Sequence, residues 1–219
     1  MSSLTAYELL LGGTTTTGAI QQVASVGTNG QLLTSAGAAA IPTMSNATHT
    51  IGSLVQLSKQ TASSSATISF TTLMNNAFNT YLLNYSLVVP ATSSANLQMV
   101  VSNNNGSGYS PGTIQSGLTY ILYTSTTLNN SNSSSAILLS GAMPTTANLG
   151  CTGNLFMYNC NNGNNFLCTG IGSFNNTTPA INQSFYSASV AATGINAIQL
   201  AMSSGNISTG TFTLYGVCE

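Results

Sequence analysis

Cysteine is the residue type with the widest chemistry in this chain, and it occurs at Cys151, Cys160, Cys168 and Cys218. No two cysteines have C-x-x-C spacing, and only one histidine could supplement them, so we expect no metal site. A Cys160–Cys168 disulfide could close the intervening loop as a hairpin staple, whereas small buried thiols explain the same residues equally well. A bond from Cys218 to Cys151 or to another subunit is a further alternative.

Other side chains that could do acid–base chemistry are scarce. The acids Glu8 and Glu219 lie at opposite ends of the sequence, and His49 is the only histidine. Hydrolysis needs a nucleophile with a base, or two carboxylates that flank the bond. No carboxylate near His49 could orient its imidazole, as a triad requires. We therefore predict that the protein is not an enzyme and has neither a catalytic nor a cofactor site.

Charge is unusually low: 1% of the 219 residues are charged, and Lys59 is the only lysine or arginine. One cation cannot release the counterions of a phosphate backbone, which excludes nucleic acid as a partner. The apolar run at residues 9–11 is too short to cross a bilayer, so we expect no membrane insertion. Self-association meets little Coulomb resistance, because copies carry no like charges to keep them apart.

The N-terminus, MSSLTAYELLLGG, lacks the basic start and long apolar stretch of a secretory signal. The composition, rich in Ser, Thr, Asn and Gly, is nevertheless typical of an extracellular protein. Release by cell lysis, as for a virion protein, reconciles the two observations, and so does a leader that has been removed. We expect a virion or another extracellular surface appendage.

Glycines interrupt residues 13–44 every few positions, so no piece of this region can close a core of its own. Its apolar side chains should bury against the main domain or a neighbouring copy. We therefore predict an N-terminal arm for attachment or intersubunit contact over residues 1–48 and a main domain over residues 49–219. The arm residues expected to make these contacts are Val23, Val26, Leu32 and Leu33.

From residue 51 onward, short runs alternate apolar and polar side chains and are separated by Asn, Gly, Ser or Pro clusters. About ten strands are expected, with a turn at Asn129–Ser135 and a short helix or loop at Thr72–Asn79. Regular spacing of strands and turns favours an all-β fold, an antiparallel β-sandwich of jelly-roll type with an extended N-terminal arm.

Uncharged polar and aromatic side chains on loops suit ligands such as sugars. Tyr109, Tyr120 and Tyr123 flank the segment from Ser110 to Leu118, which makes them candidate glycan contacts. A tyrosine on a strand also packs half-buried in many proteins, so these side chains have a purely structural alternative.

Residues 27–44, GTNGQLLTSAGAAAIPTM, resemble the glycine-punctuated segment that precedes terminal domains in phage tail fibres. Residues 195–217, INAIQLAMSSGNISTGTFTLYGV, resemble the closing strands of a β-sandwich domain in phage tail and appendage proteins. ATISFTTL and YLLNYSLVVPATSSANLQMVVSNNNGSGY are similar to its opening strands, so the likeness covers most of residues 13–217. The resemblance implies a trimeric appendage whose sandwich contacts a host surface, although such fibres ordinarily carry many more ionic residues.

These observations lead to two functional expectations. The first is a structural subunit of a phage-like virion fibre or appendage, a homo-oligomer that contacts neutral host-surface glycans. The alternative is a self-polymerising extracellular filament, in which the arm of one subunit adds a strand to the next.

Overall fold

In the computed structural model the chain divides into two compact units, residues 1–53 and residues 54–219. The described residues are 10–11, 21–22, 31–34, 42–46, 54–74, 77–122, 128–176 and 181–218. The predicted boundary fell between residues 48 and 49, and the role of the arm stays a prediction.

The N-terminal unit contains two antiparallel strand pairs. β1 (Leu10–Leu11) pairs with β2 (Gln21–Gln22), and β3 (Gln31–Thr34) pairs with β4 (Thr43–Asn46). Of the predicted arm contacts, Leu32 lies opposite Ser45 in this second pair, and Leu33 is exposed. Val23 and Val26 lie outside the described residues.

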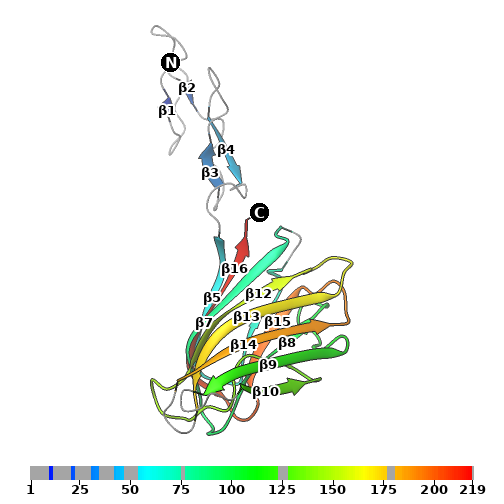
Figure 1. The fold of residues 1–219 in the computed structure, drawn as a ribbon. Coiled ribbons are helices and arrows are strands. Elements are labelled where there is room, and N and C mark those ends of the chain that lie inside the picture. Colours follow the sequence, from blue (N-terminus) through cyan, green and yellow to red (C-terminus); the bar gives the residue numbers. More distant parts are fainter. Residues whose placement is uncertain are drawn as a thin grey trace. The chain divides into compact units, whose positions relative to one another are not determined.

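The C-terminal unit is a sandwich of an eight-stranded and a four-stranded sheet, and every strand pair within each sheet is antiparallel (Figure 1). The predicted all-β class and antiparallel β-sandwich are thus confirmed. The large sheet has the order β10-β9-β14-β13-β12-β7-β16-β5. In chain order its strands are β5 (Leu54–Ser65), β7 (Thr80–Pro90), β9 (Ile114–Leu122), β10 (Leu128–Ser133), β12 (Cys151–Tyr158), β13 (Phe166–Asn175), β14 (Ile181–Val190) and β16 (Ile207–Val217).

The four-stranded sheet covers one face of the large sheet. Its order is β11-β8-β15-β6. In chain order its strands are β6 (Thr67–Phe70), β8 (Leu97–Ser102), β11 (Ile137–Leu138) and β15 (Ala197–Met202). Buried side chains of both sheets form one hydrophobic cluster, because alternate residues of each strand point inward. The Leu138 amide of the small sheet donates to Ser116 Oγ of the large sheet at 2.9 Å, which joins the two layers.

Two local expectations can be compared with the structure. The turn predicted at Asn129–Ser135 is wrong, because residues up to Ser133 belong to β10. This strand lies at the sheet edge, where side chains on both faces meet water, so its Asn and Ser residues fit a strand without any apolar alternation. The described residues between Thr72 and Asn79 form a loop, one of the two expected alternatives.

Candidate functional site

Exposed apolar side chains gather on the face of the large sheet that points away from the small sheet. Eleven large hydrophobic side chains are exposed in the described residues, and eight of them lie on this outer face. They are Ile121, Leu128, Phe156, Tyr158, Leu167, Ile171, Ile181 and Phe185. So dense a group on one sheet face is typical of a binding or association surface rather than of chance exposure.

Strand register arranges the outer face into rows that cross the strands. One row contains small or hydroxyl side chains and ends at an aromatic ring: Asn132, Gly117, Ser187, Thr169 and Phe156 lie opposite one another from β10 to β12. The row on one side includes Leu167 and Tyr158, and the row on the other includes Phe185 and Ile171. A row of mostly small polar side chains therefore lies between two mixed rows, each of which includes large apolar side chains.

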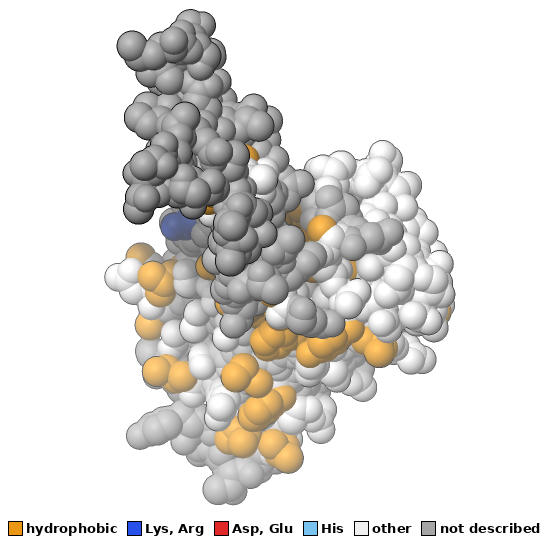
Figure 2. All heavy atoms as spheres, turned by 90° about the horizontal axis from the view of Figure 1, so that it is seen from above, with side chains coloured by type: hydrophobic (Ala, Val, Ile, Leu, Met, Phe, Trp, Pro, Cys, Tyr) orange, Lys and Arg blue, Asp and Glu red, His pale blue; other side chains and the backbone are white. Residues whose placement is uncertain are grey.

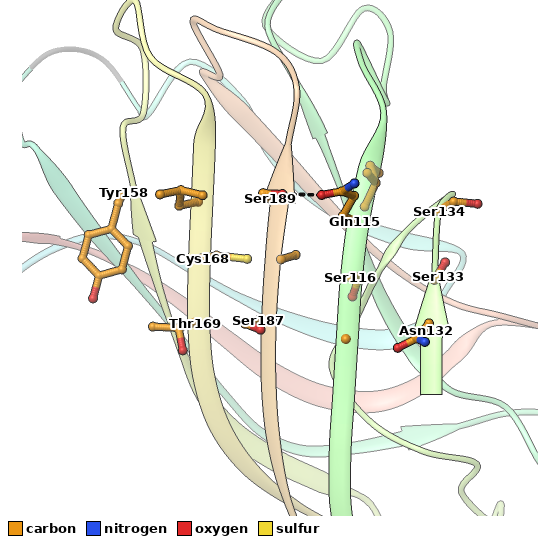
Figure 3. A pocket seen from close by; sticks show the side chains of 14 residues that line it. Gln115, Ser116, Asn132, Ser133, Ser134, Tyr158, Cys168, Thr169, Ser187 and Ser189 are labelled. Carbon is orange, nitrogen blue, oxygen red and sulfur yellow. Dashed lines mark hydrogen bonds between the residues drawn. The ribbon is translucent and has the colours of Figure 1, made fainter. Parts of the chain in front are cut away.

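This relief forms two hollows that share a floor. One, of about 960 Å³, lies toward Tyr158 and Leu167, and the other, of about 460 Å³, lies toward Phe185 and Ile171. Both are lined by Gly117, Thr169 and Ser187. We call this continuous depression the cross-strand groove. Figure 3 shows its larger hollow, where Thr169 and Ser187 lie on neighbouring strands between Tyr158 and Asn132.

The polar groups of the groove are all uncharged. Ser189 Oγ donates to Gln115 Oε1 at 3.4 Å, the interaction dashed in Figure 3. Farther along the same face, Thr119 Oγ1 donates to Asn130 Oδ1 at 2.8 Å. Within the described part of the chain, no side-chain hydrogen bond engages the hydroxyls of the floor residues Thr169 and Ser187. These hydroxyls are therefore available to a ligand as both donors and acceptors.

Beneath the groove two buried tyrosines, Tyr85 and Tyr186, support the sheet. Tyr186 lies on the inner side of β14, and its hydroxyl is 2.8 Å from the carbonyl oxygens of Asn154 and Ile171. Its ring lies against Gly170, where a Cβ would collide with the ring and with the backbone of Asn154. Burial is the main reason why the pKa of Tyr186 is raised above its ordinary value, so this hydroxyl is neutral and serves as a structural group.

Of the three tyrosines predicted to contact glycans, the two that the structure describes, Tyr109 and Tyr120, do not lie on this face. Tyr120 lies on the inward side of β9, where it packs against the core and meets Phe174 edge-on at 5.2 Å between ring centroids. Tyr109 is in the loop between β8 and β9, with its hydroxyl near Gly106 of the same loop. Tyr123 lies outside the described residues. The glycan contact of these tyrosines stays a prediction, and other residues line the cross-strand groove.

Sequence reasoning did not single out Phe156, Thr169, Phe185 or Ser187. One signal could have found this face: the neighbours Phe185 and Tyr186 must point to opposite sides of β14. Adjacent aromatic residues in a strand indicate apolar groups on both faces of the sheet. Which face is covered depends on the second sheet, and the pattern of one strand does not contain that information.

In the structure none of the four cysteines is joined in a disulfide, and Cys151, Cys160 and Cys168 are buried. Burial raises the pKa of Cys168 to about 12, and it raises the pKa of Cys160 further still, with a smaller contribution from Cys168 nearby. The Cys160 and Cys168 thiols are therefore protonated at neutral pH, which makes them poor nucleophiles and poor metal ligands. The Cys160–Cys168 disulfide stays a prediction.

Within the described ranges Lys59 is the only charged side chain, and no three His, Cys, Asp or Glu residues come together as a metal site. Those ranges also contain no helix that is long and apolar enough to span a bilayer. Comparison of the chain with family models, curated proteins and solved structures finds no match, so the groove is interpreted from its own geometry.

Proposed function

We propose that this protein is a structural, non-enzymatic subunit of an extracellular appendage of the virion-fibre type, and that its sandwich binds an uncharged saccharide. The cross-strand groove carries this proposal. It offers a neutral ligand what sugar recognition needs: hydroxyl and amide groups along a floor, and apolar walls that include aromatic rings.

The groove suits a chain-like ligand better than a compact one. Its floor crosses five strands, which at about 4.8 Å per strand gives a length of about 19 Å. Sugar rings could place their C–H faces on Phe156 or Phe185 while their hydroxyls bond Thr169, Ser187 and the amide of Asn132. An anionic glycan would find no cation on this face, since Lys59 is on the far edge strand.

The composition supports oligomerisation in an appendage. With a formal net charge of −1 over 219 residues, copies of the chain repel one another very weakly. The resemblance of residues 27–44 to a tail-fibre segment supports an arm that joins subunits. Location on a virion or another external surface belongs to the same proposal.

Binding can be tested with full-length protein on an array of immobilised neutral, sialylated and sulfated oligosaccharides, followed by calorimetric titration of the best neutral binder. Gly117→Gln places a side chain on the groove floor, where the nearest atom to a new Cβ is Asn132 Oδ1 at 3.9 Å. Gly163→Gln is the matched control, because Gly163 also faces open space but lies in the loop after β12. We expect Gly117→Gln to abolish binding and Gly163→Gln to preserve it; equal binding by both would contradict the proposal.

The exposed apolar side chains also favour a second candidate, a self-assembling filament in which another copy covers the outer face. Phe185→Ser and Ile171→Ser distinguish the two candidates. If a copy covers this face, both substitutions reduce the oligomer mass measured by sedimentation. If a saccharide binds there, the oligomer mass is unchanged and only saccharide affinity falls.

A further inference from the structure

β5 is the longest strand at an edge of either sheet. It is the last strand of the large sheet and, among the described strands, its backbone pairs with β16 alone. β5 has 12 residues, whereas the other edge strands β10, β6 and β11 have 6, 4 and 2. An edge strand presents backbone N–H and C=O groups with which a strand of another molecule can pair. β5 is thus the edge at which the large sheet could be extended farthest.

Irregularities near both ends of β5 leave a six-residue regular segment. Ser58 lies opposite Leu214 while Gln56 lies opposite Tyr215, so Leu57 is an extra residue in a β-bulge. At the other end Ser64 has a φ of 52°, which is a left-handed conformation that bends the strand. Between them residues 58–63 pair one by one with β16. Segments of about six residues are long enough for strands of separate molecules to pair stably.

The chain's only lysine or arginine falls inside this segment, and its side chain is exposed. Figure 2 shows a single blue side chain and no red one among the side chains that it colours by type. A lysine on an edge strand opposes pairing, because its ammonium needs water and repels an identical group on an approaching copy. We propose that residues 58–63 of β5 form a latent pairing edge for a second copy of this chain, and that Lys59 keeps this edge closed.

Strand geometry brings the two lysines together in the registers centred on Lys59 and on Gln60. Consider two copies whose β5 strands pair antiparallel, so that the two large sheets form one continuous sheet with both outer faces on the same side. Residues that lie opposite each other across this pairing then have their side chains on the same face of the sheet. In a register centred on Lys59, the two lysines lie directly opposite, with Cβ atoms about 5 Å apart. In a register centred on Gln60, Lys59 lies opposite Thr61, and the lysines are diagonal neighbours about 7–8 Å apart. The described residues include no Asp or Glu that could neutralise the pair.

The experiment is sedimentation velocity of the full-length chain over a concentration series, with three variants. Lys59→Ser removes the charge and should raise the self-association constant by about fivefold or more. Lys59→Arg keeps the charge and should behave as the wild type. The double variant Lys59→Ser/Thr61→Lys moves the charge two residues along the same face, and Thr61 is exposed, so it should restore wild-type behaviour.

Hydrogen exchange of the associated Lys59→Ser protein locates the contact. The outward-pointing amides among residues 58–63, which are those of every second residue, should gain protection, while those of β10, an uncharged edge, should not. Unchanged association of Lys59→Ser would overturn the proposal, as would equal association of Lys59→Arg or protection confined to another edge. Saccharide binding by Lys59→Ser should be unaffected because the groove is on other strands, so failure here is distinguishable from failure of the proposed function.

Discussion

The hydroxyls of Tyr85 and Tyr186 lie 2.9 Å apart in the core of the sandwich. Their strands, β7 and β14, are separated in the sheet by β12 and β13, so the two side chains bridge four strands beneath the groove. The Tyr85 hydroxyl is also 3.2 Å from the Leu139 carbonyl oxygen, next to the small sheet. This tyrosine pair thus connects the two layers, on the inner side of the strands whose outer side carries the proposed binding groove.

Removal of the Tyr186 hydroxyl should destabilise the fold more than removal of the Tyr85 hydroxyl. Tyr186→Phe withdraws a buried partner from two carbonyl oxygens and from Tyr85, with an expected cost of about 1–3 kcal/mol. The two substitutions should be non-additive by about 0.5 kcal/mol or more, because the hydroxyls share one network. Urea denaturation measures both quantities, with the exposed Tyr158→Phe as a control. Additive effects would show that the pair acts as two separate residues.

Gly153 provides space for the same pair. A Cβ at this position would lie 2.5 Å from the Tyr85 hydroxyl and 2.6 Å from the Tyr186 hydroxyl. Gly153→Ala should therefore destabilise the protein by about 1–3 kcal/mol through overpacking. Gly163→Ala, in open space, should change the free energy of unfolding by less than about 0.5 kcal/mol. Equal denaturant midpoints for the two variants would contradict this account of the tyrosine packing.

Strand alternation made the fold class predictable. The inward positions Leu83 and Tyr85 of β7 are buried, as their spacing implied. The alternation pattern did not reveal β10, because after Leu128 its residues are all Asn and Ser, and its backbone pairing with β9 maintains it. Propensity fails at such an edge, where the hydrogen-bond ladder decides the structure.

The candidate site was harder to predict than the fold. Tyr120 was expected to contact a ligand but points inward, whereas Phe185 was overlooked and is exposed. A strand that is apolar on both faces does not tell which face the second sheet will cover. The groove also depends on register across five strands, which brings Thr169 opposite Ser187 only after the sheet has formed.

Leu87 offers a stabilising substitution. It lies in β7 where two strand pairings shift register, it is 63% exposed, and its φ is 49°. Left-handed geometry costs an ordinary residue about 1–2 kcal/mol, and asparagine tolerates it better. Leu87→Asn should stabilise the fold by about 0.5–1 kcal/mol in urea titrations. The control is Leu54→Asn, because Leu54 is also exposed but has no positive φ, and this variant should not become more stable. If Leu87→Asn lowers the free energy of unfolding more than Leu54→Asn does, the side-chain contacts of Leu87 outweigh the backbone strain.

Stability should be flat in acid and fall steeply in alkali. The chain has two carboxylate side chains, Glu8 and Glu219, so few acids can be protonated to drive acid unfolding. Six buried groups behave differently: burial raises the pKa values of Tyr81, Tyr85, Tyr186, Cys151, Cys160 and Cys168 above their ordinary values of 9.0 for cysteine and 10.0 for tyrosine. Below pH 9 both folded and unfolded chains keep these protons, and the full stability is present.

Above pH 9 the unfolded chain loses protons that the folded chain retains, so stability falls with rising pH. Each group contributes about 1.4 kcal/mol per pH unit between its unfolded and folded pKa, so a fold of ordinary stability should unfold at about pH 10–11. Urea titrations from pH 3 to 11 under reducing conditions measure the profile. Cys168→Ala should reduce the slope of this profile above pH 9 by one proton, because burial raises the pKa of the Cys168 thiol. An unfolding transition between pH 3 and 5 would show that carboxylates stabilise this fold after all.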